Sequence, residues 1–123
     1  MSQTLVDTDI LIDFLRGKPD AIEWMDNCSQ PPLVSTVTVA ELHAGLRDGE
    51  EGAMEALLSA LGRVTIDDRV ARLAGRLRRE YGPSHGTGLA DAMIAASAVI
   101  AEARLVTRNA RHYPMLERLV VPY

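Results

Sequence analysis

Five side chains that offer oxygen ligands follow apolar segments of this chain, where a strand would pass into a helix or a loop. They are Asp7, Asp9, Glu41, Asp91 and Asn109. Oxygen ligands without histidine or cysteine suit Mg²⁺ or Mn²⁺ and not zinc. A divalent cation held by such a set would lower the pKa of a coordinated water and offset negative charge on a substrate. The residue types therefore indicate metal-dependent hydrolysis of an anionic substrate.

The first of these positions is a strand-to-helix switch at Asp7 to Asp9. Leu5-Val6 has the character of a buried strand, and apolar residues recur at helical spacing from Ile10 to Leu15. Asp9 could cap a helix that starts at Ile10, which would contribute about 1 kcal/mol. Capping accounts for one carboxylate only. Two neighbouring carboxylates raise each other's pKa unless a cation lies between them, so the pair favours a binding site.

Strands and helices alternate along the rest of the chain. Further strands are predicted at 33–37, 63–66, 105–107 and 119–121, and helices at 21–27, 39–46, 54–61, 69–81 and 89–103, with a flexible stretch at 82–88. This alternation is typical of a parallel sheet of four to five strands with crossover helices. All five oxygen-bearing side chains can therefore meet at the carboxyl edge of one sheet.

Two of the acids also have purely structural explanations. Thr38 and Glu41 match a capping box, in which the glutamate reaches back to the first backbone N–H of a helix. Asp91 lies in the first turn of a helix, where the macrodipole favours an anion by about 0.3 to 1 kcal/mol. The helix that Asp91 opens is apolar on nearly every face, however, and an acid entering a buried helix needs a partner.

Composition is that of one ordinary globular domain. The chain has 123 residues, 47% of them hydrophobic, and no apolar run long enough to span a bilayer. No secretory signal is visible, and the single Cys28 excludes an internal disulfide and suits a reducing cytoplasm. These features predict a cytoplasmic protein that does not associate with a membrane.

Charge is distributed unevenly along the chain. Residues 1–60 carry 11 acids and 3 bases, whereas residues 61–123 carry 6 acids and 10 bases. Arginines that could contact a nucleic-acid backbone are Arg69, Arg72, Arg76 and Arg79 on one helix face, together with Arg108 and Arg111. An ordinary solvated face is the alternative for that helix. The charge asymmetry indicates a polyanionic partner such as RNA.

Four segments, at 5–13, 35–42, 89–96 and 106–113, resemble in order and spacing the four motifs of PIN-domain ribonucleases, specifically the VapC toxins of toxin–antitoxin pairs. The resemblance covers essentially the whole chain. It implies a single PIN domain over residues 1–123, with a three-layer α/β/α fold around a parallel sheet. It also implies that Asp7, Glu41 and Asp91 are the core metal-binding acids, with Asp9 beside them.

The same resemblance implies supporting hydrogen bonds from Ser35 and Thr107. Many PIN domains carry a fourth aspartate where this chain has Asn109, which leaves open whether one metal or two are held. The activity implied is a Mg²⁺- or Mn²⁺-dependent endoribonuclease. The partners implied are an RNA substrate, a VapB-type antitoxin and a second copy of the chain in a homodimer.

Other functions compete with this interpretation. The Asp7-x-Asp9 pattern also resembles haloacid-dehalogenase-like phosphatases and receiver domains, but those need a downstream lysine, and Lys18 is the only lysine. The serious alternative is a non-catalytic PIN-like module that binds RNA or protein. Asn109 favours that alternative, whereas the three retained carboxylates oppose it.

Overall fold

A parallel sheet of five short strands forms the centre of the computed structural model, which describes residues 3–123. The strands are β1 (Gln3–Val6), β2 (Leu33–Ser35), β3 (Gly62–Val64), β4 (Ala103–Val106) and β5 (Leu119–Val120). Their order in the sheet is β3-β2-β1-β4-β5, and every pair is parallel. The order reverses at β1 and β4, which is the place where open α/β sheets form a crevice at their carboxyl ends.

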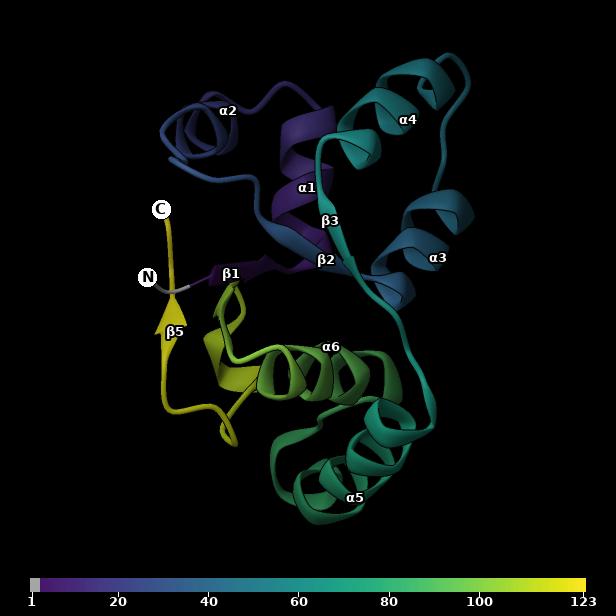
Figure 1. The fold of residues 1–123 in the computed structure, drawn as a ribbon, viewed down its shortest axis with the longest axis vertical. Helices are drawn as coiled ribbons and strands as arrows, with labels where there is room; N and C mark the ends of the chain where they lie inside the picture. Colours follow the sequence, from purple (N-terminus) through teal and green to yellow (C-terminus); the bar gives the residue numbers. More distant parts are fainter. Residues whose placement is uncertain (1–2) are drawn as a thin grey trace.

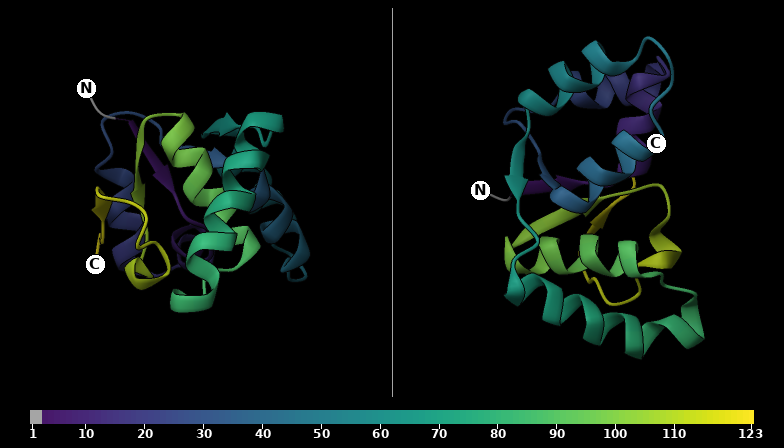
Figure 2. Two further views of the ribbon diagram at one scale, coloured as in Figure 1. Left: turned by 90° about the horizontal axis from the view of Figure 1, so that it is seen from below. Right: turned by 90° about the vertical axis from the view of Figure 1, so that its right-hand side faces the viewer.

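Helices cover both faces of this sheet. They are α1 (Thr8–Leu15), α2 (Pro19–Asp26), α3 (Thr36–Ala44), α4 (Glu51–Ser59), α5 (Asp68–His85) and α6 (Leu89–Ile100), with a short 3₁₀ turn η1 (Ala110–His112). In Figure 1, α1, α2 and α4 lie above the sheet, and α5 and α6 lie below it. Helix α3 contacts both α1 and α6 at the carboxyl edge. The three-layer α/β/α prediction is therefore confirmed, and the second view in Figure 2 shows the two helical layers apart.

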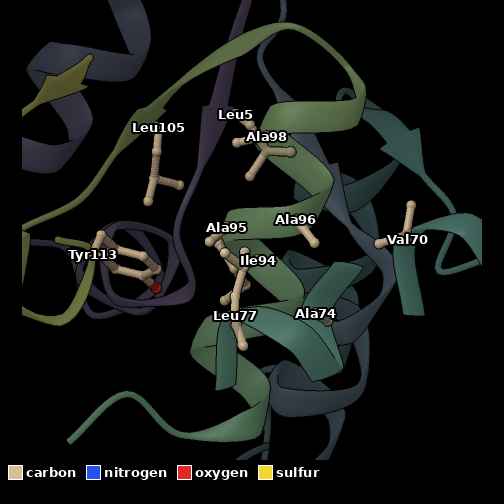
Figure 3. Packing of buried hydrophobic residues seen from close by; sticks show 11 residues of the cluster. Leu5, Val70, Ala74, Leu77, Ile94, Ala95, Ala96, Ala98, Leu105 and Tyr113 are labelled. Atoms are coloured by element: carbon tan, nitrogen blue, oxygen red, sulfur yellow. The ribbon is translucent and has the colours of Figure 1, made fainter. Parts of the chain in front are cut away.

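Alternation along the strands builds two hydrophobic cores. Leu5 and Leu105 are register partners that pack with α5 and α6, whereas the next pair, Val6 and Val106, packs with α1 and α4. The first of these cores is drawn in Figure 3. All four side chains are completely buried, and burial of each contributes about 1.5 to 3 kcal/mol. The sheet is thus anchored on both faces, which fixes the ends of β1 and β4.

The buried face of helix α6 consists largely of small side chains. Four of its alanines, Ala92, Ala95, Ala96 and Ala98, are at most 1% exposed. Small residues let α5 and α6 approach closely, and these two helices form the most extensive contact in the molecule. Asp91 is carried into the site by this rigid helix.

Most element boundaries differ from the sequence-based expectations by a few residues, and three of the differences concern helices that carry or flank site residues. Helix α1 begins at Thr8 and not at Ile10, and α3 begins at Thr36 and not at Val39. Helix α5 continues to His85, so the flexible stretch predicted at 82–88 is wrong for its first four residues. The helix ends where Gly86 adopts φ 67° and its N–H bonds to the carbonyl oxygen of Gly82.

No helix in the described part of the chain combines the length and the apolar character needed to cross a bilayer. Within the described residues Cys28 is a free, half-buried thiol.

Candidate active site

Asp7 lies at the centre of the carboxyl edge of the sheet. It follows β1 directly and is the N-cap of α1, with Oδ1 accepting a hydrogen bond from the Thr8 N–H at 2.7 Å. Its Oδ2 accepts from the hydroxyls of Thr107 at 2.7 Å and Tyr113 at 3.0 Å. The carboxylate is only 5% exposed. The capping function that the sequence suggested for Asp9 therefore belongs to Asp7.

Asp9 lies in the first turn of α1 and is held by the loop after β4. Its Oδ2 accepts from the backbone N–H of Arg108 at 3.0 Å and from the side-chain amide of Asn109 at 3.2 Å. Its other oxygen, Oδ1, is buried and has no hydrogen-bond partner among the described residues. The structure thus brings Asp9 and Asn109 together, with one carboxylate oxygen free for a further ligand.

Glu41 reaches the same edge from α3. The predicted capping box does not form, because Ser35 is the N-cap of α3 and Thr38 lies inside the helix. Glu41 Oε1 instead accepts a 2.6 Å hydrogen bond from the hydroxyl of Thr8, which also lies 2.9 Å from Thr38 Oγ1. Thr8 therefore links the first acidic pair to Glu41, a role that the sequence analysis missed.

Asp91 enters from the first turn of α6 and is half-buried. Its Oδ1 lies 3.3 Å from the Tyr113 hydroxyl, the same group that donates to Asp7, and its Oδ2 lies 3.4 Å from His112 Nδ1. Asp7 and Asp91 are thus neighbours across one tyrosine oxygen. Tyr113 was not singled out from the sequence, although its position at the end of the fourth motif was a possible signal.

The two hydroxyl residues expected to support the site behave differently. Thr107 donates to Asp7 Oδ2 and accepts from the Asn109 N–H at 3.0 Å. It therefore connects the end of β1 to the segment that follows β4. Ser35 accepts from the Val37 N–H at 3.2 Å and lies 3.0 Å from Ser97 Oγ. Its hydrogen bonds among the described residues include no carboxylate, and its role is to cap α3.

Burial sets the electrostatics of the site. The pKa of Asp7 is raised to about 6, first by burial and second by the charge of Asp9, against the hydrogen bonds that lower it. Burial also raises the pKa of Asp9. The pKa of Tyr113 is raised by burial and then by the nearby carboxylates, so its hydroxyl remains protonated and can only donate to them. A cation at this position would relieve the repulsion between the acids.

The predicted arginines fall into two groups. Arg69, Arg72, Arg76 and Arg79 are exposed on α5, and among the described residues only Arg72 makes an ion pair, with Asp68. Arg108 lies beside the site, but its guanidinium pairs with Asp13 at 2.9 Å and lies 5.7 Å from the centre of the Tyr123 ring. Arg111 is exposed on η1. Arg69, Arg76, Arg79 and Arg111 thus form no ion pair with a described residue, unlike Arg72 and Arg108.

The donor set at this edge fits a divalent cation. Every acid offers oxygen, the ligand type that Mg²⁺ and Mn²⁺ prefer, and Asp9 Oδ1 is an orphaned buried acceptor. In the described residues, no three acidic, histidine or cysteine side chains are yet close enough to form a complete metal-binding cluster. The Thr107 and Tyr113 hydroxyls occupy Asp7 Oδ2 instead.

The four acids lie at the carboxyl edge of the sheet and outside two surface cavities. Two cavities elsewhere measure about 570 and 740 Å³, and neither is lined by Asp7, Asp9, Glu41 or Asp91. The first lies beside Trp24, Cys28 and Arg104, and the second beside α6 and the segment around Leu116. An open acidic edge suits a large polymer better than a small enclosed substrate.

Comparison with known proteins identifies the same architecture. The PIN domain family matches residues 4–115. The chain is 40% identical to ribonuclease VapC19 of Mycobacterium tuberculosis, over 97% of this chain and 98% of that protein. It is 38% identical to ribonuclease VapC10 of the same species, over 97% and 92%.

Solved structures of toxin–antitoxin complexes have the same fold as this chain. A toxin–antitoxin complex from Klebsiella pneumoniae matches with a TM-score of 0.85 and 28% identity, covering 98% of both chains. A DNA-bound VapBC from Salmonella typhimurium matches with a TM-score of 0.80 and 25% identity, covering 98% of this chain and 96% of that one. The chain therefore belongs to the PIN-domain family, as a ribonuclease of the VapC type.

Proposed function

We propose that this ribonuclease is a divalent-metal-dependent endonuclease that acts as the toxin of a toxin–antitoxin pair. The observation that supports this most directly is the meeting of Asp7, Asp9, Glu41 and Asp91 at one open edge of the sheet through shared hydrogen-bond partners. Thr8 joins Glu41 to the first strand, and Tyr113 joins Asp91 to Asp7. Asn109 completes the edge by its bond to Asp9.

Asp7, Asp91 and Glu41 are the residues that would hold Mg²⁺ or Mn²⁺, with Asp9 as a further ligand. When bound, the cation would activate water and stabilise the negative charge that develops on the phosphodiester. Asp7 is the fixed member of the set, because three hydrogen bonds and its capping position hold its carboxylate. Glu41 is exposed, and its carboxylate is held by one hydrogen bond from Thr8, so its side chain can turn toward substrate.

The basic face of α5 is the proposed RNA-backbone surface. Arg69, Arg72, Arg76 and Arg79 line it, and the helix is linked to α6 by the short 86–88 segment, next to Asp91. An RNA strand lying along α5 would therefore lead toward the acids. Contacts of this kind position the substrate without selecting its sequence. Arg111 is a further exposed cation on η1, next to His112, whose Nδ1 lies 3.4 Å from Asp91 Oδ2. Arg108 contributes when its pair with Asp13 opens.

The proposed partners follow from the relatives. The Klebsiella pneumoniae structure is a toxin–antitoxin complex, and the Salmonella typhimurium one is a VapBC assembly. By analogy, a VapB-type antitoxin would bind this chain and block the acidic edge, and the toxin would form a homodimer. The free Cys28 suits action in a reducing cytoplasm.

The test is cleavage of structured cellular RNA by purified protein that is free of antitoxin. We expect cleavage with Mg²⁺ or Mn²⁺, none with EDTA, and none by folded Asp91→Asn, because that change removes a charged ligand and keeps the shape. The matched control is Asp26→Asn at the exposed end of α2. Asp26 makes no hydrogen bond or ion pair with any described residue, so this variant should cut normally. A folded wild type that binds RNA and leaves a broad panel of RNAs intact in Mn²⁺ would favour the non-catalytic module instead.

A further inference from the structure

Tyr113 is the one aromatic side chain that is built into the acidic edge. It follows η1 and is 1% exposed, and its ring packs in the core with Leu105 and Ile94. Figure 3 shows this ring at the border of the cluster, with its oxygen at the inner end. The hydroxyl lies 3.0 Å from Asp7 Oδ2 and 3.3 Å from Asp91 Oδ1. The core therefore fixes a single O–H group between two carboxylates.

A hydroxyl in this position has a restricted chemistry. A phenol carries one hydrogen, so it can satisfy only one of the two carboxylates at a time. Asp7 Oδ2 accepts from both the Thr107 hydroxyl at 2.7 Å and the Tyr113 hydroxyl, and these two donors use both lone-pair sites of that oxygen. The point where the two carboxylates converge is also the point where a cation would be most strongly stabilised. The neutral Tyr113 hydroxyl and a divalent cation would thus occupy the same position between Asp7 and Asp91.

We propose that Tyr113 is a positioning residue whose hydroxyl takes the place of the divalent cation between Asp7 and Asp91 in the metal-free protein, and so competes with that cation for Asp7 Oδ2. This inference rests on the proposed metal-dependent function. Metal entry requires the hydroxyl to give up its bond to Asp7.

The sign of the effect follows from the competition. Removing the hydroxyl leaves the two carboxylates without their shared donor, which destabilises the metal-free site more than the metal-bound one. The Tyr113→Phe variant keeps the ring and hence its packing against Leu105. It should therefore bind the cation more tightly than the wild type, whereas loss of an ordinary supporting contact would weaken binding.

The experiment is titration of the metal-free protein with Mn²⁺, followed by the electron paramagnetic resonance signal of free Mn²⁺. A hydrogen bond to a charged group corresponds to a change of about tenfold in affinity, so the Kd of Tyr113→Phe should fall by about that factor. Its melting temperature should drop in EDTA and recover in Mn²⁺. The matched control is Tyr123→Phe, which removes a hydroxyl that donates to Asp13 Oδ2 at 2.8 Å and should leave the Kd unchanged.

A second measurement needs no variant at the site. Mg²⁺ added to wild type should change the near-ultraviolet absorbance of tyrosine as the Tyr113 hydroxyl loses its carboxylate acceptor, and Tyr123→Phe should keep that change. An unchanged spectrum at saturating Mg²⁺, or an unchanged or weaker Mn²⁺ affinity in a folded Tyr113→Phe, overturns the competition while the metal-dependent function stands. A wild type that neither binds Mn²⁺ nor cuts RNA overturns both.

Discussion

Two strand-to-helix junctions contribute acids to the carboxyl edge of the sheet, and the two acids differ in burial and in how firmly they are held. At the junction of β1 and α1 the capping residue is itself the acid, so Asp7 is buried and fixed by three hydrogen bonds. At the junction of β2 and α3 a serine is the cap, and the acid, Glu41, lies further along the helix and is exposed. The capping acid is rigid and costly to keep charged, whereas the helix-surface acid is exposed and adjustable.

The largest difference between the two junctions should appear in catalysis. Asp7→Asn removes the charge at the fixed centre of the site, and we expect it to lower the cleavage rate by about 1000-fold or more. Glu41→Gln should lower the rate by a smaller factor, about 100-fold, because its side chain is held by one hydrogen bond only. Single-turnover cleavage of one RNA under saturating Mn²⁺ measures both. Equal losses in the two variants would contradict the distinction.

The next largest difference should appear in stability as a function of pH. The raised pKa of Asp7, about 6, means that the folded metal-free protein binds a proton more readily than the unfolded chain. Its contribution to stability is therefore fully present below pH about 4 and is lost as the pH rises through about 6. A pKa raised by about two units corresponds to about 3 kcal/mol lost at neutral pH.

Asp7→Asn should consequently stabilise the metal-free protein at neutral pH. The net gain expected is about 1 to 2 kcal/mol, because the weaker cap offsets part of the relief of charge. Urea unfolding in EDTA at several pH values measures this gain, which should vanish as the pH approaches about 4. Glu41→Gln serves as the control, and the exposure of Glu41 predicts no comparable gain. A destabilised Asp7→Asn at neutral pH would show that the hydrogen bonds to the carboxylate outweigh the cost of burying its charge.

The smallest expected effect is on folding stability, and it comes from Ser35, the N-cap of α3. Ser35→Ala removes the side-chain acceptor for the Val37 N–H and should cost about 1 kcal/mol of unfolding free energy. Metal affinity should change little, since Ser35 contacts no carboxylate in the described structure. Ser97→Ala is the matched control, because it removes the 3.0 Å contact between the two serines and keeps the cap. A tenfold loss of Mn²⁺ affinity in Ser35→Ala alone would return Ser35 to the supporting role first expected of it.

The position of the site was accessible from the sequence because strand ends in a parallel sheet must meet at one edge. Asp7, Glu41 and Asp91 each follow the end of an apolar segment or open a buried helix, and all three reach that edge. The family resemblance implied a supporting hydrogen bond from Thr107, and the Thr107 hydroxyl donates to Asp7 Oδ2. The assignment of metal ligands among these residues remains a prediction.

Local capping could not be assigned from the sequence, because neighbouring polar residues compete for the same backbone groups. The sequence indicated Asp9 and Thr38 as caps, whereas Asp7 and Ser35 are the caps in the structure. Where the strand stops decides which residue is the cap, and the register with β4 and β3 sets that point. The end of α5 also differed from the expectation, because the helix continues through Pro83 and ends only at the left-handed Gly86.

The sequence by itself determined the alternation of strands and helices, the two alternating cores and the acids at strand ends, because these depend on the periodicity of nearby residues. Only the tertiary structure decided which groups share a hydrogen bond. Tyr113 meets Asp7 across 106 positions of sequence, and Thr8 meets Glu41 across 33. Such contacts depend on the packing of whole helices against the sheet, and no local pattern encodes a distance between side chains that far apart.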